Sequence, residues 1–181
     1  SVFKVFSLSA ILELGAVRPE TTFFCNGFYE HPDIKEPIAC LGVHNEVGVA
    51  EIIKYSCNAG AAYASELISG MPFFEILSAF GFGQTTALQF PGESNGLFQT
   101  TDMWSARTKP TLAFGQEISV TAVQVVTAAT VYANEGILLE PRIVKKIVSP
   151  EGSIVESFSP TPVARVVSKE TASAMLLMME E

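Results

Sequence analysis

Apolar and polar positions follow a helical period over much of the chain. Apolar residues recur every three or four positions in residues 2–14, and Gly15 follows where helices commonly end. Thr121 and Gln124 form a capping-box pattern that opens another helix, which should run to Asn134 and lie in the core because apolar residues surround it. The same period predicts helices at residues 46–55, 59–68, 73–80 and 169–179.

Two long segments lack such a period. Residues 18–45 and 84–103 are rich in turn-forming residues, so we expect surface excursions with at most short strands. Residues 142–148 and 153–158 are strand-like, and the turn between them, 149–152, contains proline and glycine in favoured places. These two runs should form a hairpin, and the chain as a whole is predicted to be α+β.

Length and composition predict one globular domain. The 181 residues are 48% hydrophobic, which is enough to build a core. The 19 acidic and 11 basic residues give a net charge of -8, which argues against a nucleic-acid-binding surface. No apolar run reaches the roughly 18 to 20 residues of a bilayer helix, and no export leader opens the chain, so neither is expected within it.

Ser1 and Lys4 are the first candidates for catalysis. Three positions apart on a predicted helix, they share one face, so their side chains can touch. A poorly solvated lysine loses its proton well below its usual pKa of about 10.4 and can then activate a serine hydroxyl for acyl transfer. Free N–H groups at the helix start could stabilise an oxyanion. The spacing alone is common by chance, and a surface serine with a solvated lysine would also explain it.

A second tripeptide, Ser56-Cys57-Asn58, lies between two predicted helices, where Ser56 could simply cap a helix and Asn58 form a turn. Ser1-Val2-Phe3-Lys4 and this tripeptide resemble the Ser-x-x-Lys and Ser-x-Asn motifs of penicillin-binding proteins and serine β-lactamases, whose third motif is Lys-Thr-Gly. Longer segments resemble class B penicillin-binding proteins, in matching order, across essentially the whole chain. These segments are residues 3–8, 24–27, 38–40, 80–83, 90–93, 114–116, 118–121 and 132–136.

The resemblance implies a peptidoglycan D,D-transpeptidase that forms an acyl-serine intermediate on D-Ala-D-Ala stem peptides and is inhibited by β-lactams. Ser1 would be the nucleophile and Lys4 its base, while Ser56 and Asn58 would relay protons and position the substrate. No cofactor is implied. The expected partners are the stem peptide, β-lactam antibiotics and cell-wall synthesis proteins of the divisome or elongasome. The expected location is the outer face of a bacterial cytoplasmic membrane, with an anchor outside this chain.

The sequence departs from the family pattern in three ways. Asn45 stands where the family usually has glycine, a mild change because Asn tolerates a left-handed backbone, and Glu117 stands where a small residue is usual. Residues 1–181 contain no Lys-Thr-Gly. In the family, strands before the first motif and around the third build a five-stranded sheet. We therefore expect a β-lactamase/transpeptidase-like fold represented mainly by its helical lobe and a small hairpin, a partial domain that is inactive alone.

The cysteines and histidines allow three interpretations. Cys25, His31, Cys40 and His44 could be zinc ligands, but they lack the close Cys-x2-4-Cys pairs of structural sites, so no bound metal is expected. They could instead be buried thiols and loop histidines. The third interpretation is a redox-sensitive disulfide between Cys40 and Cys57, which would couple the second motif to oxidation.

Other activities fit the first motif. A serine β-lactamase shares it but must also place a hydrolytic water, and the class A glutamate motif for that water is not evident. A β-lactam-sensing receptor would be acylated once and use the adduct as a signal. The excursion at residues 18–45 and the segment at residues 90–93 favour the transpeptidase. A piece that serves only structure or binding is a further alternative.

Overall fold

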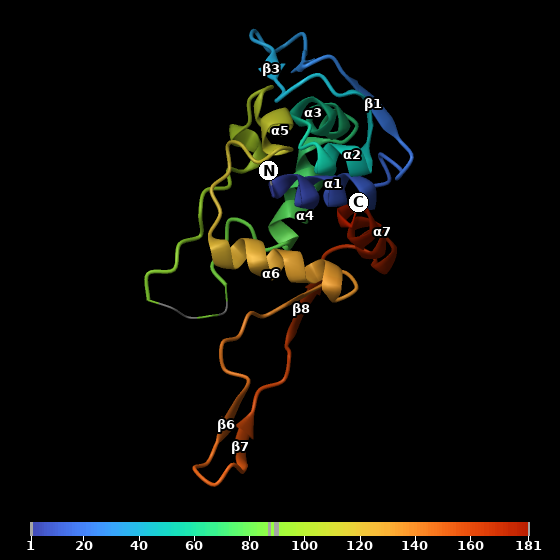
Figure 1. Cartoon of the computed structure of the whole chain (residues 1–181). Helices are drawn as coiled ribbons and strands as arrows, with labels where there is room; N and C mark the ends of the chain where they lie inside the picture. The colour runs from blue at the N-terminus through green and yellow to red at the C-terminus, as the bar shows by residue number, and fades with distance from the viewer. Residues whose placement is uncertain (1, 87, 89–90, 181) are drawn as a thin grey trace.

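The computed structural model describes residues 2–86, 88 and 91–180, and these form a helical body with small two-stranded sheets (Figure 1). The helices are α1 (Phe3–Glu13), α2 (Val49–Lys54), α3 (Asn58–Glu66), α4 (Gly70–Ala79), α5 (Thr108–Leu112), α6 (Ala122–Ala133) and α7 (Lys169–Met179), with a 3-10 helix at Thr101–Met103. The strands are β1 (Thr22–Cys25), β2 (Phe28–Tyr29), β3 (Ile38–Ala39), β4 (Asn45–Gly48), β5 (Ile137–Leu139), β6 (Lys146–Val148), β7 (Ile154–Ser157) and β8 (Pro162–Arg165). The α+β prediction is confirmed.

Helix α1 lies at the centre of the body (Figure 1). Residues 6–11 are all buried, because α2, α3, α4 and α7 pack around the helix. Phe6 contacts the rings of Phe80 and Phe82 at centroid distances of 5.4 and 5.1 Å, and Tyr132 of α6 stacks on it at 6.2 Å. Burying each such ring contributes about 1.5 to 3 kcal/mol. The first turn of α1 is therefore attached to the buried core.

The helix predicted at residues 46–55 is wrong over its first turn. Residues Asn45–Gly48 form β4 instead, which pairs antiparallel with β1 and places Glu46 opposite Phe24. This pairing joins segments about twenty residues apart, so it cannot be inferred from local periodicity. Helix α2 then begins at Val49, where the Glu51 carboxylate accepts the Gly48 N–H (2.8 Å).

Helix α6 has the predicted capping box but not the predicted burial. Thr121 Oγ1 accepts the Gln124 N–H (3.1 Å), and Gln124 Oε1 accepts the Thr121 N–H (2.7 Å). Val126 is 65% exposed, whereas Val131 is fully buried. Only one side of α6 faces the body, so the expectation that apolar residues all around the helix would be covered is wrong.

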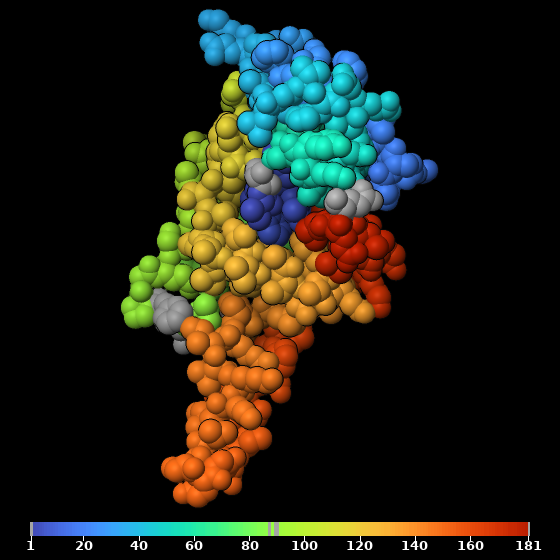
Figure 2. Space-filling model, in the orientation of Figure 1, coloured from blue at the N-terminus to red at the C-terminus, as the bar shows by residue number. Residues whose placement is uncertain are grey.

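An arm projects from the body below α6 (Figures 1 and 2). Its tip is the antiparallel pair β6–β7, which confirms the predicted hairpin, and all residues of both strands are exposed. The pair β5–β8 joins the arm to the body, with Ile137 opposite Arg165. A two-stranded hairpin without a covered face is marginally stable in water. The tip of the arm therefore contributes little to the core.

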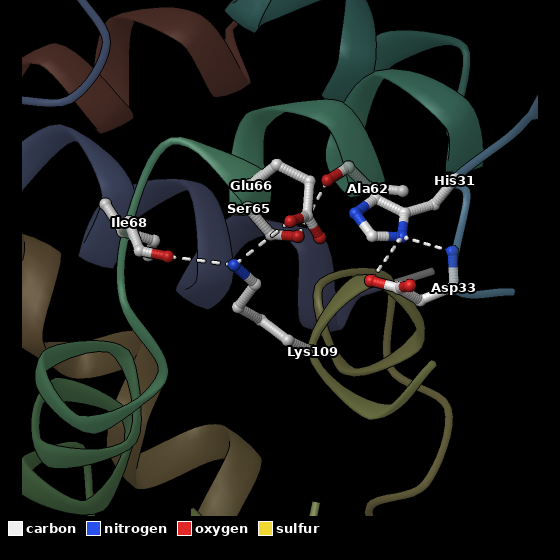
Figure 3. A network of polar contacts seen from close by, with 7 residues as sticks. All are labelled: His31, Asp33, Ala62, Ser65, Glu66, Ile68 and Lys109. Carbon is white, nitrogen blue, oxygen red and sulfur yellow. Dashed lines mark hydrogen bonds and ion pairs between the residues drawn. The ribbon is translucent and has the colours of Figure 1, made fainter. Parts of the chain in front are cut away.

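Helix α5 has no counterpart among the predicted elements. It is only one turn long, contains Pro110, and packs against α3. The Lys109 Nζ lies 3.2 Å from a carboxylate oxygen of Glu66 and donates a hydrogen bond to the Ile68 carbonyl (2.9 Å), as Figure 3 shows. Tertiary contacts of this kind, rather than a local pattern, hold a helix that is too short to form alone.

Candidate active site and adjoining thiol cluster

Lys4 is a buried charged residue on the first turn of α1, with 1% of its surface exposed. Its Nζ donates hydrogen bonds to Ser56 Oγ (3.1 Å) and to Asn58 Oδ1 (2.8 Å). The centroid of the Phe114 ring lies 5.6 Å from the same nitrogen. The structure thus brings together three of the four residues that the two motifs nominate. Phe114 lies beside the site, and the sequence indicated it only as part of the family-like segment 114–116.

The Ser56-Cys57-Asn58 tripeptide is the junction between α2 and α3, as predicted. Ser56 has a φ of 54°, and the N–H groups of Ser56 and Cys57 donate back to two carbonyls in the last turn of α2 (3.1 and 3.0 Å). This is the hydrogen-bond pattern of a Schellman motif, whose left-handed position usually holds glycine. The turn presents Ser56 and Asn58 to Lys4, while the Cys57 thiol between them is buried beside Cys40.

The surroundings of Lys4 bring the pKa of its amine closer to neutrality. Burial lowers the pKa of Lys4 from 10.5 to about 8, because little water remains to solvate the ammonium. Coulombic interaction with Cys40 and Cys57 acts in the opposite direction and limits the fall. A neutral amine keeps two N–H groups for Ser56 and Asn58 and has a lone pair left to accept a proton.

Ser1 lies outside the described residues, as does Phe90 of the family-like segment 90–93. Helix α1 begins at Phe3 with Val2 as its N-cap, so Lys4 is on the first turn, as predicted. The catalytic roles assigned to the motif residues stay predictions at this point.

Two residues that depart from the family pattern have left-handed backbones. Asn45 has a φ of 59° and Glu117 a φ of 58°. A left-handed conformation costs a residue with a β-carbon about 1 to 2 kcal/mol, and Asn less than most. The Glu117 carboxylate accepts hydrogen bonds from the hydroxyls of Thr108 and Thr111, both at 2.8 Å. These two bonds hold Glu117 at a position that would otherwise favour glycine.

A cluster of thiols and one imidazole adjoins the Ser-x-Asn turn. Its ligand-type atoms all lie within 4.8 Å of one another. The members of this thiol cluster are Cys25, Cys40, His44 and Cys57. His31, which the sequence-based zinc interpretation included, is not among them. Its Nδ1 accepts the Asp33 N–H at 3.2 Å instead (Figure 3). That interpretation also omitted Cys57. The signal that could have found the cluster is the spacing Cys40-x3-His44 together with a cysteine inside the second motif.

The three cysteines are free thiols, and the pKa values of Cys40 and Cys57 are shifted in opposite directions. Burial opposes ionisation of Cys40, but N–H groups that include those of Ala59 and Asn58 outweigh it and lower the pKa of that thiol. At Cys57, burial dominates and raises the pKa. The Sγ atoms of Cys40 and Cys57 are 3.7 Å apart, which is close but not bonded. A redox role for this pair stays a prediction.

Known proteins are similar to this chain in both sequence and fold. Residues 1–181 match the family described as penicillin binding protein transpeptidase domain. The chain belongs to this transpeptidase family. Penicillin-binding protein PbpB of Mycolicibacterium smegmatis is 30% identical to this chain over 178 residues. The match covers 98% of this chain and 27% of PbpB.

Solved structures of the family superpose on nearly the whole chain. A peptidoglycan synthetase from Bifidobacterium adolescentis gives a TM-score of 0.88 at 31% identity, covering 99% of this chain and 33% of that one. Penicillin binding protein 3 from Mycobacterium tuberculosis, complexed with aztreonam, gives a TM-score of 0.84 at 31% identity, covering 98% and 40%. The transpeptidase-family chain therefore spans less than half the length of each of these proteins.

Proposed function

We propose that the polypeptide containing these residues is a peptidoglycan D,D-transpeptidase whose chemistry is carried by Ser1, Lys4, Ser56 and Asn58. The observation that supports this most directly is the buried Lys4 amine, hydrogen-bonded to both polar residues of the Ser-x-Asn turn. Burying a lysine is costly for a fold, and a buried ionisable group with a strongly lowered pKa is typical of a functional site.

In the proposed acylation, the neutral Lys4 amine takes the hydroxyl proton of Ser1 as that oxygen attacks the carbonyl carbon of the penultimate D-alanine. The tetrahedral intermediate then collapses, the C–N bond to the terminal D-alanine breaks, and the leaving amine receives a proton through Ser56. The amine of a second stem peptide attacks the acyl-serine in the next half-reaction. Its proton returns through the same groups, and the serine hydroxyl is regenerated.

Asn58 has a positioning role in this mechanism. Its Oδ1 accepts the hydrogen bond from Lys4, while its Nδ2 donates to the Ala39 carbonyl at 3.4 Å. The two bonds fix which side of the amide faces the lysine. The amine is therefore held in one orientation, which is the condition for efficient proton transfer.

A β-lactam would enter the same first step. Its ring amide is opened by the serine, but the leaving nitrogen stays attached to the acyl group, so the adduct blocks the site. The M. tuberculosis relative was solved in complex with aztreonam. By the same proposal, β-lactams acylate Ser1 in this protein.

The setting of the reaction is part of the proposal. None of the helices in the described part of the chain has both the length and the apolar character to cross a bilayer. Because the matched region is under half of each relative, we assign the membrane anchor and the Lys-Thr-Gly strand to other parts of the polypeptide. Residues 1–181 would then be a partial domain at the outer face of the cytoplasmic membrane, working with other cell-wall synthesis proteins.

A fluorescent penicillin tests the assignment. In a polypeptide that includes these residues and a Lys-Thr-Gly motif, we expect one adduct, located on Ser1 by peptide mass mapping. Lys4→Ala should slow labelling by about a hundredfold or more, since general base catalysis contributes about 10² to 10⁴. Lys54→Ala is the matched control, because Lys54 is exposed on the surface of α2. An adduct on another serine, or equal labelling rates in the two lysine variants, would refute the proposal.

A further inference from the structure

The thiol cluster has the composition of a metal site. Three segments contribute to it: Cys25 ends β1, Cys40 and His44 flank a turn before β4, and Cys57 caps α3. Cys25 and Cys57 are fully buried, and the other two side chains are half-buried. Three thiols and one imidazole form a donor set typical of closed, structural zinc sites.

The spacing of the donor atoms agrees with a tetrahedral ion. With bonds of about 2.3 Å to sulfur and about 2.0 to 2.1 Å to nitrogen, tetrahedral Zn²⁺ separates two sulfurs by about 3.8 Å and a sulfur from a nitrogen by about 3.6 Å. The observed Cys40 Sγ to Cys57 Sγ distance is 3.7 Å. The His44 Nδ1 lies 3.6 Å from both Cys25 Sγ and Cys40 Sγ. Three of the six edges of a coordination tetrahedron are thus already at the expected length.

Backbone donors and an aromatic ring orient the ligands. The Asn58 N–H donates to Cys40 Sγ (3.1 Å) and the Gly60 N–H donates to Cys57 Sγ (3.3 Å), both from the N-terminal turn of α3. Such bonds favour the thiolate, which is the form that binds a metal. The His44 ring stacks on Tyr55, with centroids 5.8 Å apart and planes 8° from parallel. The imidazole is therefore held with Nδ1 toward the sulfurs.

We propose that Cys25, Cys40, His44 and Cys57 bind one Zn²⁺ ion, which fastens the segment from β1 to β4 to the Ser-x-Asn turn. Soft thiolates select zinc over harder cations such as Mg²⁺ and Ca²⁺. Each ligand that is still a thiol releases its proton to solvent on binding. Three thiolates and a neutral imidazole leave the bound site with a net charge of -1.

The ion would stabilise a region whose strands are very short and whose Tyr29, Ile38 and Val47 anchor it to the core. Between Thr22 and Gly48 the secondary structure consists of strands of two to four residues in two-stranded pairs, which are marginal without further support. Cys57 lies between Ser56 and Asn58, so the ion also fixes the turn that positions Lys4. The site does not depend on acylation of Ser1, and it can be tested separately from the proposed transpeptidase.

Metal content of the full chain is the first measurement. The protein is purified under reducing conditions and analysed for zinc by elemental mass spectrometry, with one equivalent expected. His44→Ala and Cys25→Ser should each weaken zinc binding by about a hundredfold or more in a chelator competition, because even losing a residue that only supports a ligand costs about 10- to 100-fold. His31→Ala is the matched control and should keep the wild-type affinity, since His31 lies outside the cluster.

A measurement on the unaltered protein covers the case in which a variant fails to fold. After removal of zinc by a chelator, addition of Co²⁺ should produce intense thiolate-to-cobalt absorption and the visible bands of tetrahedral cobalt, and added Zn²⁺ should abolish both. The zinc-free protein should also melt at a lower temperature. Wild-type protein with no stoichiometric zinc and no thiolate-to-cobalt bands would overturn the proposal. So would a Cys40 to Cys57 disulfide recovered quantitatively from protein purified without oxidant.

Discussion

The lowered pKa of Lys4 predicts a specific pH dependence for β-lactam acylation. Only the neutral amine can accept the serine proton, so the rate should follow the fraction of Lys4 that is deprotonated. That fraction rises with pH and levels off above the pKa of about 8. An exposed lysine would not reach its plateau until above about pH 10.

The size of the effect follows from the pKa. At pH 7 a lysine of pKa about 8 is about 9% neutral, whereas one of pKa 10.5 is about 0.03% neutral, a difference of about 300-fold in available base. Between pH 6 and pH 8 the neutral fraction, and hence the rate, should increase about 50-fold. Between pH 8 and pH 9.5 it should increase only about twofold.

Stopped-flow labelling with a fluorescent penicillin measures this profile, with a Ser1→Ala variant giving the background at each pH. Lys4→Arg should be slow at every pH, because guanidinium keeps its charge and its N–H donors but does not act as a base. Lys54→Arg should reproduce the wild-type curve. A flat wild-type profile from pH 6 to 9 would refute the role of Lys4 as base. A rise that continued undiminished to pH 10 would refute the lowered pKa.

Three further predictions concern stability and the limits of the chain. Glu117→Ala should lower the free energy of unfolding by about 2 kcal/mol, because the hydroxyls of Thr108 and Thr111 lose their acceptor. Glu117→Gly should lower it by about 1 kcal/mol less than Glu117→Ala does, because glycine relieves the left-handed strain. Urea titrations of the two variants check this, and equal losses would contradict the strain argument. Residues 1–181 alone should label with penicillin at least a hundredfold more slowly than a span extended through Lys-Thr-Gly, since losing one oxyanion donor costs about 10² to 10³; similar labelling rates would count against the partial-domain interpretation. Replacing residues 146–157 with a short glycine-containing turn should change the melting temperature by less than about 2 °C, because every residue of both strands is exposed. A larger fall would show that the arm supports the body.

Elements with strong local signals were predictable from the sequence. The capping box of Thr121 and Gln124 fixed the start of α6, and the Pro-Gly turn fixed the β6–β7 hairpin. Helix α4 was predicted to begin at Phe73 but begins at Gly70. The proline at position 72 does not prevent this, because the N–H groups of a first turn have no helical partner. Strand β4 and helix α5 were missed because distant partners, rather than their own residues, determine their conformation.

The candidate site, like the fold, could be predicted from the sequence only in part. The Ser-x-Asn turn could be assigned to the same site as Lys4 only from the family resemblance of the two motifs. The thiol cluster could not, because it depends on strand register: β1 pairs with β4 so that Cys25 lies opposite Asn45, next to His44. Linear spacing nominated His31 instead of Cys57, since it contains no information on which loops fold toward one another.

The central position of α1 restricts how such a protein could evolve resistance to an antibiotic. Any substitution from position 6 to position 11 alters a side chain packed on all sides, and truncating a large one costs about 2 to 5 kcal/mol out of a total stability of about 5 to 15 kcal/mol. Each such change removes a large share of the stability of the protein. Under the proposed function, selection for weaker β-lactam binding should therefore act on the excursion at residues 18–45, where Ala39 and Cys40 contact Asn58, and leave the helix that carries Lys4 unchanged.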